Sequence, residues 1–138
     1  MTWEPRPVPD VTPETEPFWK GASEGRLLLS ECQDCGLVYH YPRVLCPDCF
    51  SEDVEWLEAD GEGEVYSYSV TRTMSGWPKE DLPLVVAYVE LDEGPRLMTN
   101  IQADQDVVDV GTRVTVRFKE TETNDIAIPV FVPISAER

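Results

Sequence analysis

The feature that most constrains this chain is its set of four cysteines, which stand in two Cys-x-x-Cys pairs separated by ten residues: Cys32, Cys35, Cys46 and Cys49. This spacing brings four thiolates to one point while a short hairpin closes between the pairs. Gly36 permits the left-handed turn in which backbone amides point at sulfur, and Pro47 stiffens the second pair. We therefore predict one tetrahedral metal site, with Zn²⁺ as the expected ion.

A shell of four thiolates leaves no coordination position for water, so the predicted metal is structural. Its binding free energy would serve as folding free energy for a ribbon whose core is small. Two other uses of these cysteines stay open: iron in a rubredoxin-like electron carrier, and two disulfides in an oxidising compartment. One zinc ion per chain in a colourless protein would favour zinc.

Five segments rich in β-branched or aromatic residues follow Gly61, and they cover residues 64–73, 84–91, 96–102, 112–120 and 126–132. The segment between the third and fourth is long enough for one helical turn. Five strands with a short helix in that place are typical of an OB-fold. The predicted fold class is mainly β: an N-terminal helical arm and a rubredoxin-like zinc ribbon, followed by a five-stranded OB-fold barrel.

We expect three regions along the chain: an arm with a short helix (1–25), a zinc ribbon (26–60) and the barrel (61–138). The helix is expected to begin at Thr12 as N-cap with Pro13 in its first position, and to end at Gly21 or Gly25. The sequence has no run of about 20 apolar residues and no signal-peptide pattern, so we expect a cytoplasmic protein.

The chain is strongly acidic, with 27 acidic and 11 basic residues and a formal net charge of −16. Such a surface repels polyanions, so free nucleic acid is not an expected partner. The acid excess and the scarcity of lysine resemble proteins of a salty cytoplasm, where the Debye length is only about 3 Å at molar salt. We therefore expect higher stability in concentrated KCl than in dilute buffer.

Several motifs together resemble one known family. The Pro-Phe-Trp of residues 17–19 leads to Gly25, then follow Cys-x-x-Cys-Gly, Tyr-Pro-Arg, Cys-Pro-x-Cys and a Leu-Asp-Glu-Gly-Pro-Arg hairpin at 91–96. The pattern resembles the zinc-ribbon plus OB-fold proteins associated with acyl-CoA enzymes, long catalogued as a domain of unknown function. The likeness covers nearly the whole chain after the arm.

The resemblance implies a non-catalytic scaffold that binds a thiolase-like, hydroxymethylglutaryl-CoA synthase-like, aldolase or hydratase enzyme in a hetero-oligomer. It also implies that the chain helps to enclose the CoA thioester of its partner. Arginines can meet the CoA phosphates, and an exposed tryptophan can anchor an interface. The candidate CoA-binding or partner-binding residues are Arg72, Trp77, Arg96, Arg113, Arg117 and Lys119. The alternative for the cations is that they are solvated charges that balance nearby acids, and the alternative for Trp77 is a lid over the barrel.

Two other functions remain open. A single-strand nucleic-acid binder would use OB-fold aromatics such as Tyr66 and Tyr68, which strict alternation places on one strand face. Acidity opposes this function, because residues 1–60 and 61–138 both carry more acidic than basic side chains. An enzyme is the third reading. His40 is the only histidine and every cysteine is committed to metal, so the sequence offers no recognisable nucleophile with a base.

Overall fold

The computed structural model describes residues 9–75, 77–121 and 126–134. The N-terminal part contains α1 (Glu16–Ser23), β1 (Leu27–Cys32), β2 (Val38–Tyr39) and β3 (Val54–Ala59). The rest contains β4 (Glu62–Thr71), η1 (Lys79–Asp81), β5 (Leu84–Leu91), β6 (Arg96–Ile101), η2 (Gln105–Val107), β7 (Arg113–Glu120) and β8 (Ala127–Pro133).

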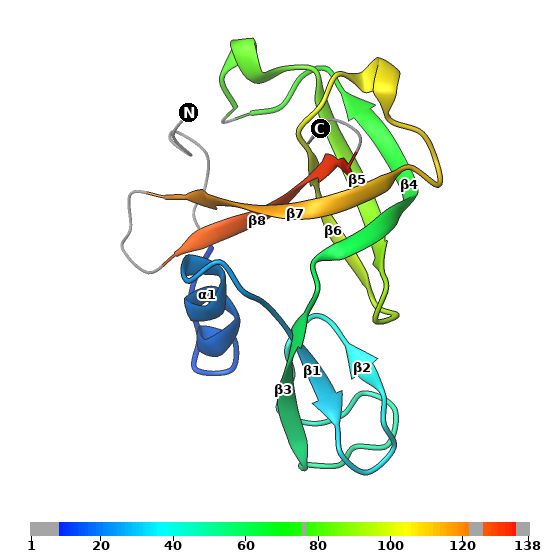
Figure 1. Ribbon diagram of the computed structural model, residues 1–138. Coiled ribbons are helices and arrows are strands. Elements are labelled where there is room, and N and C mark those ends of the chain that lie inside the picture. Colours follow the sequence, from blue (N-terminus) through cyan, green and yellow to red (C-terminus); the bar gives the residue numbers. More distant parts are fainter. Residues whose placement is uncertain (1–8, 76, 122–125, 135–138) are drawn as a thin grey trace.

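Strands β1, β2 and β3 form a small antiparallel sheet in the order β2-β1-β3. The longer pairing joins β1 to β3, from Leu27 opposite Ala59 to Cys32 opposite Val54. This sheet lies below the barrel in Figure 1, and the chain passes from β3 directly up into β4. The cysteine pairs sit at the end of the sheet that is farthest from the barrel.

The remaining strands close into a barrel in the order β4-β5-β6-β8-β7. All pairings are antiparallel except that of β6 with β8, where Ile101 lies opposite Phe131 in parallel orientation. This order, with the short helix η2 between the third and fourth barrel strands, is that of an OB-fold. The predicted fold class is therefore confirmed, and each barrel strand lies within two residues of its expected range.

Apolar side chains at alternate positions along the strands fill the barrel interior. On β5 the inward side chains Val85, Ala87 and Val89 are buried, whereas Tyr88 between them is exposed. At Gly63 the strands approach so closely that a Cβ would lie 2.4 Å from the carbonyl oxygen of Glu90. The two-residue period of the sequence thus corresponds to side chains that point alternately into the barrel and out to solvent.

The helix begins one turn later than expected. Thr15, not Thr12, is the N-cap, and Glu16 is the first helical residue. The carbonyl of Thr12 accepts bonds from the amides of both Thr15 and Glu16 (3.0 and 2.8 Å), so residues 12–15 form a separate turn. Gly25, with φ +79°, ends the helix.

Helix α1 joins the ribbon and the barrel through one shared core. Phe18 and Trp19 are buried in the same cluster as Leu27 and Ala59 of the ribbon sheet and Phe131 of the barrel. The helix lies below β8 and beside the ribbon in Figure 1, and it contacts β1, β7 and β8. Phe18 and Trp19 therefore act as packing anchors, which a short helix needs in order to be stable.

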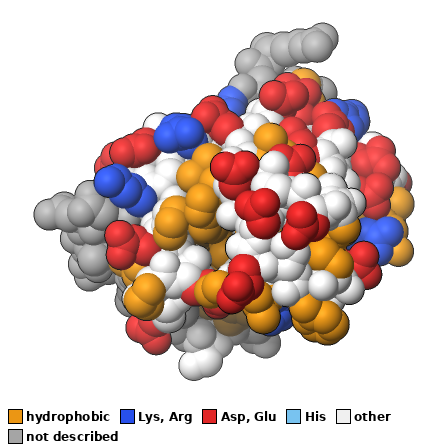
Figure 2. Space-filling view, turned by 90° about the horizontal axis from the view of Figure 1, so that it is seen from below, with side chains coloured by type: hydrophobic (Ala, Val, Ile, Leu, Met, Phe, Trp, Pro, Cys, Tyr) orange, Lys and Arg blue, Asp and Glu red, His pale blue; other side chains and the backbone are white. Residues whose placement is uncertain are grey.

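The surface seen from the ribbon end combines charge with exposed apolar groups. Figure 2 shows acidic side chains spread over this face, fewer basic ones, and hydrophobic side chains gathered in patches between them. No helix in the described residues is long and apolar enough to cross a membrane.

Candidate functional site

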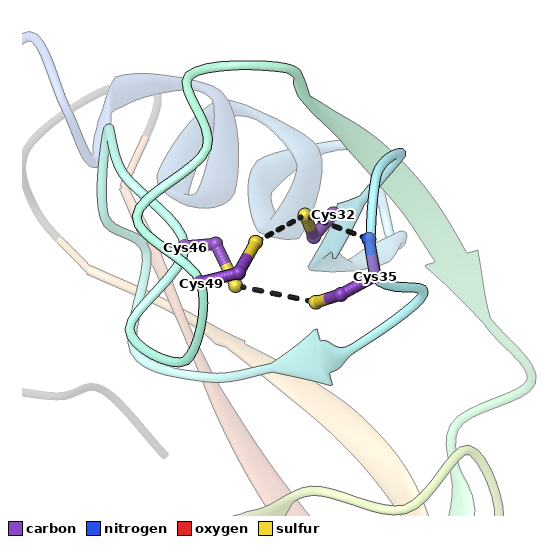
Figure 3. A group of neighbouring side chains, drawn as sticks. All are labelled: Cys32, Cys35, Cys46 and Cys49. Atoms are coloured by element: carbon purple, nitrogen blue, oxygen red, sulfur yellow. Dashed lines mark hydrogen bonds between the residues drawn. The ribbon is translucent and has the colours of Figure 1, made fainter.

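The four cysteine sulfurs converge at the tip of the ribbon. Their Sγ atoms all lie within 4.8 Å of one another, and the Cys32–Cys49 and Cys35–Cys46 pairs are each 3.6 Å apart. Figure 3 shows the two pairs facing each other across a common centre. Tetrahedral zinc with bonds of about 2.3 Å separates its sulfurs by about 3.8 Å. The cysteine cluster therefore fits a zinc ion, with Cys32 and Cys46 buried and Cys35 and Cys49 exposed.

Each cysteine pair is held in the same backbone turn. The amide of Gly36 donates to the carbonyl of Cys32, and the amide of Phe50 donates to the carbonyl of Cys46, both at 2.9 Å. Further amides point at sulfur: that of Cys35 lies 3.4 Å from Cys32 Sγ, and that of Asp48 lies 3.4 Å from Cys46 Sγ. These donors offset the negative charge of four thiolates around one ion.

Crowding of the sulfurs separates the pKa values of the thiols. The backbone amide of Cys35 lowers the pKa of Cys32 to about 7. The amide of Ser51 lowers the pKa of Cys49, but burial and the other three sulfurs outweigh it and raise that pKa to about 12. The Cys32 thiol therefore ionises readily, whereas the Cys49 thiol keeps its proton until a cation displaces it. Metal binding to this cluster must release protons and strengthen as the pH rises.

His40 is a packing residue and does not belong to the metal-binding cluster of the four cysteines. Its ring lies 5.1 Å from that of Phe18 and 5.2 Å from that of Tyr41. With Trp19 and Met98 these side chains line an apolar pocket of about 390 Å³ between α1 and the barrel. Burial lowers the pKa of His40 to about 4, so the imidazole is neutral at pH 7.

The lowered pKa of His40 predicts that the folded chain loses stability in acid. In the unfolded chain His40 takes up its proton near pH 6.5, but in the folded chain only near pH 4. The contribution of the neutral His40 imidazole to the free energy of unfolding is therefore complete above pH 6.5 and is lost as the pH falls toward 4. About 1.4 kcal/mol of it is lost at pH 5.5. Urea unfolding at pH 7.5 and 5.5 should show this loss in the wild type and a smaller one in His40→Phe. Equal losses in the two proteins would contradict the assignment.

Two of the predicted binding residues meet at one pocket. Arg72 and Trp77 line a hollow of about 470 Å³ together with Met74, Lys79 and Leu82. The pocket lies beside η1, at the end of the barrel opposite the ribbon in Figure 1. It joins two cationic side chains to an aromatic one, which suits a ligand that combines an anion with a flat ring.

Arg96 lies elsewhere, on the outer face of the barrel. Its guanidinium sits 3.6 Å above the ring of Tyr66, and its Nε donates to Glu90 at 3.1 Å. A bulge in β4 between Val65 and Ser67 makes Tyr66 the extra residue. Strict alternation therefore fails at this point, and Tyr66 and Tyr68 do not form the simple stacking face that the sequence suggested.

The cations of β7 have partners within the chain. Arg113 makes two hydrogen bonds of 2.9 Å to the carboxylate of Asp92, and Glu62 lies 3.8 Å away. This hydrogen-bonded guanidinium lowers the pKa of Asp92. Arg117 donates to the carbonyl of Val116 at 2.8 Å, and Lys119 is half-buried on the same strand. The structure thus brings Arg72 and Trp77 together and places the other four candidates apart from them.

An apolar surface lies at the second cysteine pair, and the sequence pattern did not predict it. Phe50 is 72% exposed, and it lines a hollow of about 510 Å³ with Val44, Leu45, Arg43 and other neighbours. One signal was present: the position after the first Cys-x-x-Cys is glycine, whereas the same position after the second is phenylalanine.

Family comparisons agree with this architecture. Residues 19–55 match the family model described as "ChsH2, rubredoxin-like zinc ribbon domain". Residues 56–119 match "ChsH2, C-terminal OB-fold domain". The first match spans all four clustered cysteines, which supports structural zinc as the ion of the ribbon.

Curated relatives are named as enzyme subunits or scaffolds. A "Probable enoyl-CoA hydratase alpha subunit" of Thermomonospora curvata is 36% identical over 129 residues, which are 93% of this chain but only 40% of that protein. A "DUF35 domain-containing scaffold protein" of Methanothermobacter thermautotrophicus is 38% identical over 93 residues, 66% of this chain and 70% of the relative. The "Benzoylsuccinyl-CoA thiolase subunit BbsA" of Geobacter metallireducens is 25% identical over 99 residues, 72% of this chain and 66% of that subunit.

A solved structure extends the likeness over most of the chain. A chain of the structure described as "Ltp2-ChsH2(DUF35) aldolase" superposes with a TM-score of 0.79 at 35% identity. The match covers 91% of this chain and 98% of that one.

Proposed function

The chain belongs to the ChsH2 family of zinc-ribbon and OB-fold proteins, whose relatives include the DUF35 scaffold proteins, and from this we propose that it is a non-catalytic scaffold subunit. It binds a thiolase-like or other acyl-CoA enzyme and helps to bind the CoA thioester of that enzyme. The observation that carries the proposal is the likeness to the chain of the "Ltp2-ChsH2(DUF35) aldolase" over 98% of that chain's length.

The chemistry of the described residues supports a role without catalysis. All four cysteines are taken up by the metal cluster, and a complete thiolate shell leaves no open position on zinc for water or substrate. His40 is half-buried, its imidazole is neutral at pH 7, and it packs against aromatic rings. Nucleophilic catalysis needs a nucleophile in contact with a base, and these groups provide neither.

The shape of the molecule suits a subunit that contacts a CoA thioester and a partner protein at the same time. The pocket of Arg72, Trp77 and Lys79 lies at one end of the barrel, and the zinc ribbon projects from the other. In this scheme the first end takes part of the CoA thioester, with Trp77 against its adenine ring and the two cations near its phosphates. The ribbon end then remains for protein contact.

Co-purification tests the partner assignment. The full chain with an affinity tag, expressed in its native cells, should recover a thiolase-like, hydroxymethylglutaryl-CoA synthase-like, aldolase or hydratase enzyme that mass spectrometry identifies. The purified chain alone should not turn over acyl-CoA substrates. Turnover by the chain alone, or recovery of nucleic acid without an acyl-CoA enzyme, would overturn the proposal.

Charge removal tests the CoA pocket. Arg72→Gln should weaken binding of CoA to the scaffold–enzyme complex by about tenfold in calorimetric titration, because a charge-assisted hydrogen bond to phosphate is lost. Arg26→Gln makes the same charge change on the ribbon, where Arg26 pairs with Glu58 at 2.9 Å, and should leave CoA binding unchanged. Equal affinities for the Arg72 variant and the wild type would remove the pocket from the proposal.

A further inference from the structure

We propose that the second cysteine pair carries the main contact for the partner enzyme, through an exposed apolar surface that we term the knuckle patch. The knuckle patch consists of Val44, Leu45, Pro47 and Phe50. It inserts Phe50 into an apolar socket with a basic rim on the acyl-CoA enzyme. This inference rests on the proposed function and adds to it a surface, a central residue and the chemistry of the opposing site.

The apolar side chains of the knuckle patch are largely exposed to solvent. Phe50 is 72% exposed, Val44 63% and Leu45 41%, and all three line the hollow of about 510 Å³. Clustered exposed apolar side chains with a polar surround are typical of protein-binding sites, and a central aromatic is the residue type that most often dominates binding energy.

The backbone at Phe50 provides an independent argument. Phe50 has φ +62° and is the only described non-glycine residue with positive φ, while Gly36 holds the equivalent place with φ +81°. Both residues donate to the carbonyl of the cysteine four positions earlier, and both follow the second cysteine of a pair. Glycine would adopt this conformation without steric cost, whereas phenylalanine does so at a penalty. The folded chain gains little burial from Phe50 in return, so the side chain serves something other than folding.

The knuckle patch is held rigidly before any partner arrives. The amide of Cys46 donates to the carbonyl of Ser51 at 3.0 Å, which closes the turn on which Phe50 sits. The amide of Val44 donates to the carboxylate of Glu14 at 3.0 Å, which ties the loop to the turn before α1. A surface fixed in this way loses little conformational entropy on binding.

The charges around the knuckle patch define the opposing surface. Residues 31–60 carry eight acidic side chains and a single basic one, Arg43. Two carboxylates are next to the knuckle patch: Asp34, one of these eight, accepts a hydrogen bond from Ser51, and Glu14, from the turn before α1, lines the same hollow as Phe50 and Arg43. An acidic rim around an apolar centre is complementary to an apolar socket with lysine or arginine at its edge. A nucleic acid, which is a polyanion, does not fit this surface.

Two substitutions at Phe50 separate binding from folding. Phe50→Gly and Phe50→Asn both accept positive φ, so each variant should bind one zinc per chain and melt no lower than the wild type. Each should weaken binding to the acyl-CoA enzyme identified by co-purification by about thirtyfold, which is the loss expected from truncation of a central aromatic contact. Biolayer interferometry with the purified enzyme measures this affinity.

Val110→Asn is the control, because Val110 is 64% exposed and belongs to the barrel, between η2 and β7, where the neighbouring Gly111 donates to the carbonyl of Val65. It should bind the enzyme as the wild type does. Unchanged affinity of both Phe50 variants, with the wild type binding normally, would overturn the knuckle patch and leave the scaffold function standing. Failure of the wild-type chain to bind any acyl-CoA enzyme would overturn the scaffold function and this inference together.

Discussion

Replacement of Cys46 by serine should abolish zinc binding and unfold the ribbon. Cys46 is fully buried, and its sulfur lies 3.6 Å from that of Cys35. A serine hydroxyl is a poor zinc ligand, so the coordination shell fails. Zinc binding contributes about 10 kcal/mol or more to the folding of comparable ribbons. Because Leu27 and Ala59 of the ribbon sheet belong to the shared core, the barrel should lose stability as well.

Metal analysis and amide hydrogen exchange measure this effect. The wild type should carry one zinc per chain, and Cys46→Ser should carry none and lose amide protection across β1 and β3. Asp48→Asn is the control, because Asp48 contributes a backbone amide to the sulfur cluster and its side chain can change without removing that bond. A Cys46→Ser chain that keeps its zinc and its protection would show that the ribbon does not depend on the metal.

Truncation of Phe131 to alanine should destabilise the barrel more than any single change on its surface. Phe131 is fully buried, lies opposite Ile101 at the parallel closure of β6 and β8, and accepts a backbone bond from Gln102 at 2.8 Å. Removal of a buried phenylalanine ring costs about 3–5 kcal/mol because it leaves a cavity. A domain whose stability is about 5–15 kcal/mol would lose a large part of it.

Thermal and urea unfolding of the zinc-loaded protein check this prediction. The melting temperature of Phe131→Ala should fall by roughly 10 °C. Phe50→Asn removes the same kind of ring from the exposed knuckle patch and should melt close to the wild type. If both variants lost equal stability, the ring of Phe131 would not be the closing element of the core.

Much of the fold could be predicted because its signals are local. Alternation of apolar and polar residues located the five barrel strands, since each strand has one buried face. The spacing of the cysteines located the metal cluster, because short knuckles leave the sulfurs few other arrangements. The helix start was less accurate. Thr12 and Thr15 are both good N-caps, and hydrogen bonds of the preceding turn decided between them.

The candidate binding residues were harder to assign. Arg113 and Asp92 are far apart in the sequence, and only barrel closure makes them an ion pair. The bulge at Tyr66 shifts the alternation of the residues after it, so that Tyr68 lies opposite the buried Ala87, which the sequence pattern alone does not predict. The sequence does not predict the exposure of Phe50, because that exposure depends on the packing of the whole ribbon.

The sequence by itself determined the metal cluster, the strand pattern and the acidic surface, because these depend on spacing, periodicity and composition within short stretches of chain. Only the tertiary structure decided that Arg72 and Trp77 share a pocket, that Arg113 is neutralised by Asp92, and that Phe50 stands exposed in a left-handed turn. The physical reason is that a side chain's neighbours and exposure come from contacts between segments distant in sequence. Those contacts form only when the ribbon, helix and barrel pack together.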